Sequence, residues 1–119
     1  MTTQQVANRL VELCRMGQIE TAQTELFADD AVSTEPENAQ SPMKVVHGLP
    51  AILGKGKMFM SMVEEFHDSS ISEPVIAGDN FAISWSIDVT MKGQPRSAMN
   101  EICVYKVKDG KIASEQFFS

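Results

Sequence analysis

The sequence predicts an α+β fold in which three amphipathic helices come first and a curled antiparallel sheet follows them. Apolar residues recur at helical spacing in three segments before His67. From Phe81 to Met91, apolar and polar side chains alternate without an error, which is the period of a strand with one buried face. The Asp-Gly pair at residues 109–110 is a turn that two-residue hairpins prefer. A sheet that curls under covering helices makes a pocket, so we expect the function to lie inside it.

The first two helices are expected to form a hairpin. Gly17 fits a left-handed helix end between them. A second, shorter apolar stripe over residues 19–27 is expected to stop at Asp29 and Asp30. The apolar face of the first helix is expected to consist of Val6, Leu10, Leu13 and Cys14.

The third helix is expected to open at Gly48-Leu49-Pro50, because proline suits the first helical turn. Gly54 and Gly56 weaken such a helix by roughly 1 kcal/mol each relative to alanine. We expect the helix to end near Phe66 or His67. Its apolar face would consist of Ile52, Phe59, Val63 and Phe66, with Met58 and Met62 beside them.

The strands are expected near residues 69–77, 80–92, 97–108 and 111–118, with short strands possible near 31–34 and 44–47. Residues 33–46 form the longest stretch without periodicity, and Ser41-Pro42 is a turn former within it. Loops of this length serve either as functional mouths or as plain connectors, and the sequence leaves both open.

Length and composition indicate one soluble domain over residues 1–119. The net charge of -6 argues against nucleic acid and against an anionic membrane surface as partners. No apolar run approaches the roughly 20 residues that span a bilayer, and no signal-peptide pattern opens the chain, so we expect a cytoplasmic protein. Cys14 and Cys103 are expected to remain unpaired.

Three stretches of the chain together carry a resemblance to a known family. The first is LFADDAV at residues 26–32, followed by Glu35-Pro36. The second is Gly48, which leads into the third helix. The third is VYKVKDGKI at residues 104–112, running into EQFF at 115–118. In this order and spacing, the set covers essentially the whole chain and resembles the SnoaL-like, nuclear-transport-factor-2-like superfamily.

The resemblance implies a cone-shaped α+β barrel, in which a strongly curved antiparallel sheet encloses a cavity and the three N-terminal helices close it. Members of this superfamily include steroid isomerases, polyketide cyclases, epoxide hydrolases, dehydratases and binding domains, and the fold alone does not decide among them. The resemblance also implies a homodimer, formed through the outer sheet face, where small polar residues such as Ser84 and Ser86 are expected.

Glu35 is the candidate base, because isomerase-like members carry a carboxylate just before the proline of this turn and Glu35 precedes Pro36. A carboxylate in an apolar cavity has a raised pKa, which suits proton transfer. The alternative is an acid exposed in a loop. The isomerases also hold the oxyanion with a tyrosine on the first helix and an acid on the third long strand. Leu10 and Cys103 stand at the matching positions, and neither is a good donor.

Strand parity indicates what could replace those donors. If Cys103 faces the cavity, Glu101 and Tyr105 share its face and become candidate polarising groups. A slip of register would instead turn Glu101 outward into solvent. The residues expected to line the cavity as a ligand-binding wall, or to fill it as core, are Leu10, Met62, Trp85, Ile87, Val89, Met91 and Cys103.

Two functions follow from these residues. The first is a protein that binds an apolar or amphipathic metabolite, anchored by Glu35, Glu101 and Tyr105. The second is an isomerase, cyclase or hydratase that needs no cofactor, in which Glu35 moves a proton while Tyr105 and a protonated Glu101 polarise an oxygen. The missing oxyanion donors favour the first function.

The remaining polar residues are expected to play no part in the site. His47 and His67 have no partner carboxylate at ligand spacing, so no metal is expected. Lys55 and Lys57 are expected to be solvated surface residues. A third reading of the whole chain, beside the two functions above, is a purely structural dimer whose cavity is filled by side chains.

Overall fold

Two helices come before the first strand, and the third helix lies between the second and third strands. The computed structural model describes residues 1–37, 39 and 44–119, so Asn38, Ser41 and Pro42 of the expected loop lie outside the described residues. Within this part of the chain, the helices are α1 (Thr3–Arg15), α2 (Ile19–Leu26) and α3 (Leu49–Met62). None of them combines the length and the apolar character needed to cross a membrane. The strands are β1 (Phe27–Thr34), β2 (Val45–His47), β3 (Val63–Ile71), β4 (Val75–Ala77), β5 (Asn80–Met91), β6 (Arg96–Lys108) and β7 (Lys111–Phe118).

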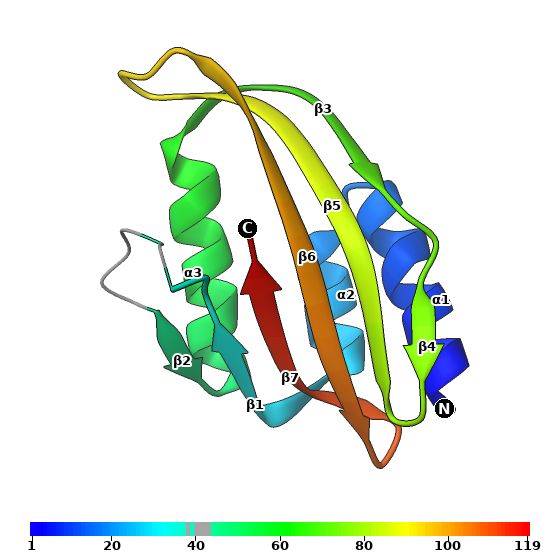
Figure 1. The fold of residues 1–119 in the computed structure, drawn as a ribbon. Coiled ribbons are helices and arrows are strands. Elements are labelled where there is room, and N and C mark those ends of the chain that lie inside the picture. The colour runs from blue at the N-terminus through cyan, green and yellow to red at the C-terminus, as the bar shows by residue number, and fades with distance from the viewer. Residues whose placement is uncertain (38, 40–43) are drawn as a thin grey trace.

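The strands of the described residues form one sheet in the order β2-β1-β7-β6-β5-β3, and β4 pairs with β5. β1 and β7 run parallel whereas the other pairs are antiparallel, so the sheet is mixed and not purely antiparallel as predicted. Parallel neighbours need a long crossover, and the chain between β1 and β7 supplies it. Figure 1 shows β5 and β6 curving, with α1 and α2 behind them and α3 to one side. This is the curved α+β architecture that the sequence predicts.

Local sequence signals set the first helical hairpin. The Thr2 hydroxyl accepts a hydrogen bond from the Gln5 amide at 3.1 Å, and the Gln5 side chain accepts one from the Thr2 amide at 2.9 Å. This reciprocal capping box satisfies free donors at the start of α1. Gly17, with a φ of 75°, provides the left-handed turn after which α2 folds back. The buried face of α1 consists of Val6, Ala7, Leu10, Val11, Leu13 and Cys14.

The core lies between these helices and the concave face of the sheet. Phe81 of β5 and Tyr105 of β6 are 1% and 2% exposed, and their rings stack with 4.8 Å between centroids. Ile83 and Ile112 extend the same apolar layer along β5 and β7. Full burial of one such side chain contributes roughly 1.5–3 kcal/mol, so this layer fixes the helices against the sheet.

The third helix ends earlier than the sequence predicts. α3 stops at Met62, and Val63–Ile71 forms β3. Pairing with β5 overrides the helical spacing here, because Phe66 lies opposite Val89 in the ladder and is 50% exposed. His67 therefore lies within a strand and does not end a helix.

Two other boundaries also differ from the prediction. Asp29 and Asp30 do not terminate the second helix, since β1 starts directly at Phe27 and contains both residues. Both are exposed, and the pairing of β1 with β7 is irregular at this point. The strand predicted over residues 69–77 is divided between β3 and β4, because Pro74 between them has no amide hydrogen for a ladder.

The last hairpin matches the prediction. Lys108 pairs with Lys111 around Asp109 and Gly110. The φ angles of these two turn residues are 52° and 76°, as a type I′ turn requires. The hairpin brings β7 back along β6 and so carries its alternate side chains onto the concave face.

Candidate functional site

The concave face of the sheet carries the alternate residues of β5 and β6 that strand parity predicts. The register pairs Ile83 with Cys103 and Trp85 with Glu101. Ile83 and Cys103 are 2% and 0% exposed, which identifies this face as the inner one. Glu101 therefore shares the inner face, and the register slip that would turn it outward has not occurred.

Glu115 is a buried carboxyl on this face that the sequence analysis did not single out as a site residue. It lies on β7 beside Ser33 of β1 and is 4% exposed. Its Oε1 accepts a hydrogen bond from the Ser33 hydroxyl at 2.8 Å. Burial disfavours its charged form and raises its pKa from 4.5 to about 7, although Ser33 and Lys55 oppose the rise. Glu115 therefore changes its protonation state near neutral pH.

Lys55 of α3 reaches the same place. Its Nζ donates to the Ser33 hydroxyl at 2.6 Å and lies 2.8 Å from Oε1 of Glu35. The Lys55 side chain is only 16% exposed, so the prediction of a solvated surface lysine is wrong. Its ammonium also lies 5.4 Å from the centroid of the Phe117 ring, within cation–π range. Ser33 accepts from Lys55 and donates to Glu115, so the three side chains form a directed chain of hydrogen bonds.

Glu35, the predicted base, directly follows β1 and is partly buried. Its side chain is 22% exposed, and one of its oxygens is held by Lys55. Its backbone amide donates to the Lys44 carbonyl at 2.7 Å, which fixes the residue in the segment that follows β1. Glu35 is therefore paired and partly buried and is not the solvent-exposed acid of the alternative. Its role as a base stays a prediction.

Glu101 lies beside these residues on β6 and is partly buried. Burial raises its pKa first, the neighbouring charge of Glu35 raises it further, and Lys55 opposes both effects. Among the described residues its side chain has no hydrogen-bond or ion-pair partner. We call the following five residues the charged cluster: Ser33, Glu35, Lys55, Glu101 and Glu115.

Three other predicted site residues belong to the hydrophobic core. Tyr105 and Cys103 are 2% and 0% exposed, and burial raises the pKa of both side chains. Leu10 of α1 is 2% exposed. A ligand would have to displace core contacts to reach them, and contact with a ligand stays a prediction for all three.

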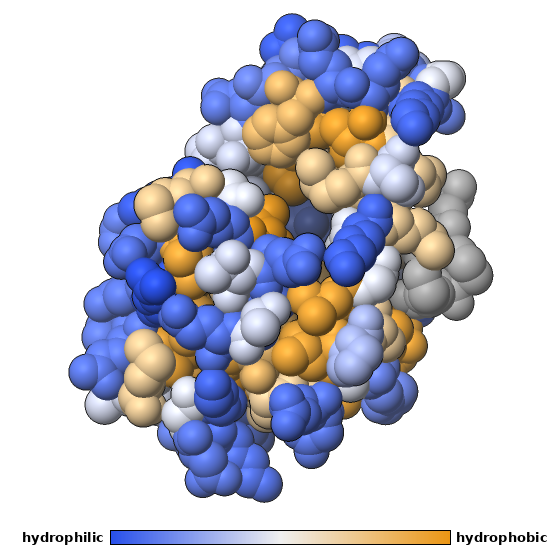
Figure 2. Space-filling view, turned by 180° about the vertical axis from the view of Figure 1, so that it is seen from behind, coloured by the Kyte–Doolittle hydropathy of each residue, from blue (hydrophilic) through white to orange (hydrophobic). Residues whose placement is uncertain are grey.

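Apolar side chains at the C-terminal ends of α3 and β5 remain exposed or partly exposed to solvent. Figure 2 shows a hollow on the helix-bearing face beside α3, with apolar side chains on much of its rim and hydrophilic colour at its bottom. Val89 is buried at 0% exposure, unlike the other wall residues of β5. Met58, Met60 and Met62 of α3 are 53%, 52% and 52% exposed. The partly exposed wall residues of β5 are Trp85, Ile87 and Met91.

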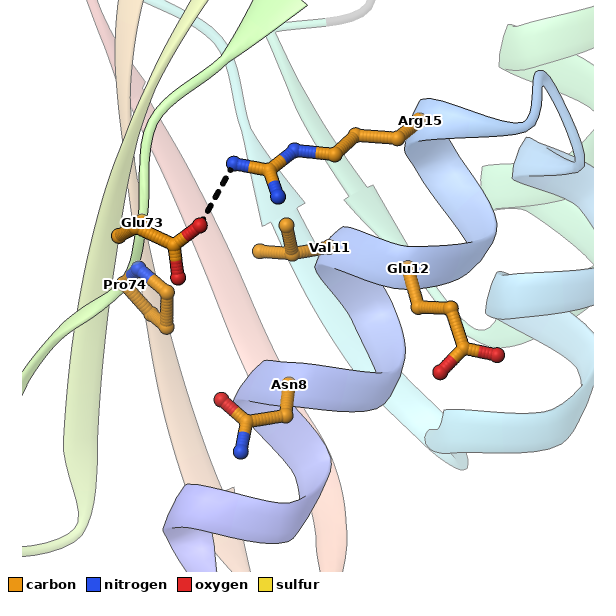
Figure 3. A pocket seen from close by; sticks show the side chains of 6 residues that line it. All are labelled: Asn8, Val11, Glu12, Arg15, Glu73 and Pro74. Carbon is orange, nitrogen blue, oxygen red and sulfur yellow. Dashed lines mark ion pairs between the residues drawn. The ribbon is translucent and has the colours of Figure 1, made fainter.

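A groove of about 490 Å³ lies elsewhere, against the outer side of α1. Figure 3 shows Arg15 reaching across it from α1 to Glu73, with 3.0 Å between Nη2 and Oε1. The same nitrogen donates to the Ile71 carbonyl at 2.7 Å. These contacts attach the connection between β3 and β4 to α1 and pair two charged groups of the groove, Arg15 and Glu73.

The described residues contain no group of three His, Cys, Asp or Glu side chains that could hold a metal ion. His67 lies on β3 at the edge of the sheet, with its Nε2 2.8 Å from the Thr90 hydroxyl. His47 is exposed on β2. The two histidines thus sit on strands outside the charged cluster.

Comparison with known proteins covers the whole chain. A family model described as the SnoaL-like domain matches residues 1–119. The solved structure of a candidate SnoaL-like polyketide cyclase from Mesorhizobium loti, described also as a carbohydrate phosphatase, is 35% identical, covers 100% of both chains and has a TM-score of 0.92. A search of curated proteins found no match.

Two more distant structures show the fold alone. A protein of unknown function with a cystatin-like fold from Xanthomonas campestris is 19% identical, with a TM-score of 0.83 over 100% of this chain and 91% of the other. A protein with a ketosteroid isomerase-like fold from Catenulispora acidiphila, solved in complex with trimethylamine, is 21% identical. Its TM-score is 0.74 over 96% of this chain and 84% of its own.

Proposed function

Because this chain belongs to the SnoaL-like domain family, we propose that it binds a small apolar or amphipathic molecule in the hollow beside α3. The observation that carries the proposal is the charged cluster. The Lys55 side chain of α3 is 16% exposed and Glu115 as a whole residue is 4% exposed. Glu115 shares the concave face with buried apolar side chains of β5 and β6. A few polar groups placed within an apolar concave wall are the usual lining of a ligand site.

The apolar half of the site supports the same function. Met58 and Met62 belong to α3, the helix beside the hollow, and are 53% and 52% exposed. Methionine is flexible and polarizable, so it adapts to ligands of different shape. The relative from Mesorhizobium loti is a candidate polyketide cyclase, and polyketides combine apolar carbon with oxygen groups. A ligand of that chemistry would place its carbon skeleton on the methionines and its oxygens near the charged cluster.

A neutral fluorescent probe tests the proposal. 1-Aminoanthracene brightens in apolar surroundings, and we expect saturable binding to the wild-type protein. Ile87→Trp adds bulk to the inner wall and should weaken the affinity at least tenfold. Gln94→Trp, in the exposed turn that follows the same strand, is the control and should leave it unchanged. Saturable binding that both variants leave intact, or none at all, would count against a site in the hollow.

A second candidate is a cofactor-independent isomerase, cyclase or hydratase, and the raised pKa of Glu101 and Glu115 favours it. A carboxyl with a pKa near 7, such as Glu115, both accepts and releases protons at neutral pH. In this candidate Glu35 is the proton-transfer base, with Glu101 and Tyr105 polarising an oxygen. The test is exchange of the α-protons of 2-tetralone in D2O, followed by proton NMR. The enzyme hypothesis predicts exchange that Glu35→Gln abolishes and Glu64→Gln, an exposed strand variant, does not.

We also propose that the protein is a homodimer in the cytoplasm. Ile102 and Phe118 are 47% and 48% exposed on the convex face and lie opposite each other in the ladder between β6 and β7. An exposed apolar pair of this kind favours contact with a second copy. Sedimentation velocity should give a dimer that Ile102→Lys dissociates.

A further inference from the structure

The indole Nε1 of Trp85 is a buried donor without an acceptor. In the described part of the chain, it is the one buried side-chain nitrogen or oxygen that lacks a hydrogen-bond partner. The Trp85 ring packs against the hydrophobic core and remains partly exposed as a whole. Native proteins pair nearly all of their buried polar groups, so an orphaned N–H calls for an acceptor that is not part of the folded chain.

Trp85 lies between Glu101 of β6 and Ile71 of β3 in the sheet, and Glu101 is the polar one of these two neighbours. Trp85 and Glu101 lie directly opposite each other in the ladder between β5 and β6, and their side chains share the concave face. Directly opposed side chains of this kind start about 5 Å apart. The Glu101 side chain also lacks a hydrogen-bond or ion-pair partner among the described residues, so two unengaged polar side chains occupy opposed positions on the concave face.

The charges around these two groups restrict the acceptor. Glu35 and Glu101 repel an anion, and the ammonium of Lys55 is already held by Glu35 at 2.8 Å. A cation offers no acceptor to an N–H donor. A neutral oxygen, either of a carbonyl or of a hydroxyl, fits both constraints.

We propose that the Trp85 indole N–H determines specificity by donating a hydrogen bond to a neutral oxygen of the ligand, which displaces the side chains that cover the buried Nε1 and comes to lie beside the Glu101 carboxyl. The inference rests on the proposed binding function and names the polar contact within that site. The sequence predicts Trp85 only as an apolar residue that lines or fills the cavity, whereas this inference gives it a polar role. Leu10 of α1 and Cys103 of β6 supply no such donor, whereas Trp85 of β5 carries one.

The test uses two probes that differ by one oxygen. 2-Tetralone and tetralin share a bicyclic carbon frame, and only the ketone can accept a hydrogen bond. Trp85 is the only tryptophan, so 15N-labelled protein gives a single indole N–H signal. We expect the ketone to bind about tenfold more tightly than tetralin. We also expect the ketone alone to move the indole proton downfield, as a new hydrogen bond does.

Variants separate the donor from the shape of the wall. Trp85→Phe removes the N–H, and the ratio of the two affinities should fall to about one. Phe117→Leu changes another aromatic residue of the concave face that has no donor, and the ratio should persist. If Trp85→Phe does not fold, the indole signal of the wild-type protein still decides. 2-Tetralol repeats the measurement with a hydroxyl and identifies which neutral oxygen is preferred.

Three results would overturn the inference. Equal affinities for ketone and tetralin, with equal movement of the indole signal, would mean that the N–H forms no hydrogen bond with the ketone oxygen. A ratio that survives Trp85→Phe would place the oxygen at another donor. In both cases binding itself, and so the proposed function, would stand. If neither probe binds, the binding function fails and the inference fails with it.

Discussion

Replacing Glu115 with glutamine tests whether this carboxyl is desolvated by the fold. Its pKa rises from 4.5 to about 7 because it is buried, at 4% exposure, beside Ser33. Below pH 4.5 the group is protonated in both the folded and the unfolded chain, so its full contribution to stability is present. As the pH rises towards 7, the unfolded chain ionises first, and the folded state loses stability until the folded carboxyl also ionises.

The size of this loss follows from the two pKa values. Each pH unit between 4.5 and 7 costs the folded state about 1.4 kcal/mol, so the loss reaches about 3 kcal/mol above pH 7. Glutamine is neutral at every pH and keeps an oxygen that accepts from Ser33. The free energy of unfolding of Glu115→Gln should therefore gain about 3 kcal/mol relative to wild type between pH 4 and pH 8.

Urea denaturation at several pH values, followed by the fluorescence of Trp85, measures this difference. Glu64→Gln is the control, because Glu64 is exposed on β3 and water solvates its charge. If the change of the Glu115→Gln difference with pH stays within about 0.5 kcal/mol of the change measured for Glu64→Gln, the carboxyl is not desolvated and the reasoning is refuted.

Three further predictions concern the charged cluster and the attachment of α3. Lys55→Met removes a positive charge that favours the ionised form of Glu115, so the pKa of Glu115 should rise further in a carbon-13 NMR titration of the glutamate carboxyls. A pKa that stays or falls would mean that Lys55 does not act on it. Ser33→Ala removes the donor to Glu115 and the acceptor for Lys55, and should cost about 1–3 kcal/mol in urea denaturation while also raising the pKa of Glu115. A loss of stability without a change in that pKa would contradict the hydrogen bond. Ile52→Ala should cost about 2–5 kcal/mol, since Ile52 is 0% exposed and is the buried residue of α3, whereas Met60→Ala, at 52% exposure, should change stability by less than about 0.5 kcal/mol. Equal losses would show that α3 is not held at Ile52.

The fold was largely predictable because its signals are local. The alternation from Phe81 to Met91 predicts a strand from neighbouring residues alone. The Asp-Gly pair before Lys111 predicts a turn in the same way. The end of α3 was not predictable in this way. Met62 through Phe66 continue a helical apolar spacing, and only pairing with β5 converts Val63–Ile71 into a strand.

The site was predictable only in part, because most of its residues are brought together by long-range pairing and not by local sequence signals. Parity along β6 places Glu101 on the inner face because it depends on one strand alone. Lys55, Ser33 and Glu115 come from a helix and two strands that are far apart in the sequence, and the parallel pair of β1 and β7 brings two of them together. The available signal was the alternation in β7, which puts Glu115 on the same face as Phe117. Without the parallel partner, that alternation does not distinguish a buried acid from an exposed one.

The cost of Glu115 is itself an argument for function. A group that destabilises the fold at neutral pH contributes little that an apolar side chain would not supply better, since replacing buried ionic groups with well-packed apolar ones is often neutral or stabilising. The fold accepts Glu115 on the concave face with Ser33 and Lys55 already engaged around it. Strongly perturbed carboxyls of this kind concentrate at functional sites. A Glu115→Gln protein that is more stable at pH 8 but binds 2-tetralone less tightly would show that the site, and not the fold, requires the carboxyl. Equal binding of the ketone by both proteins would assign Glu115 to the fold alone.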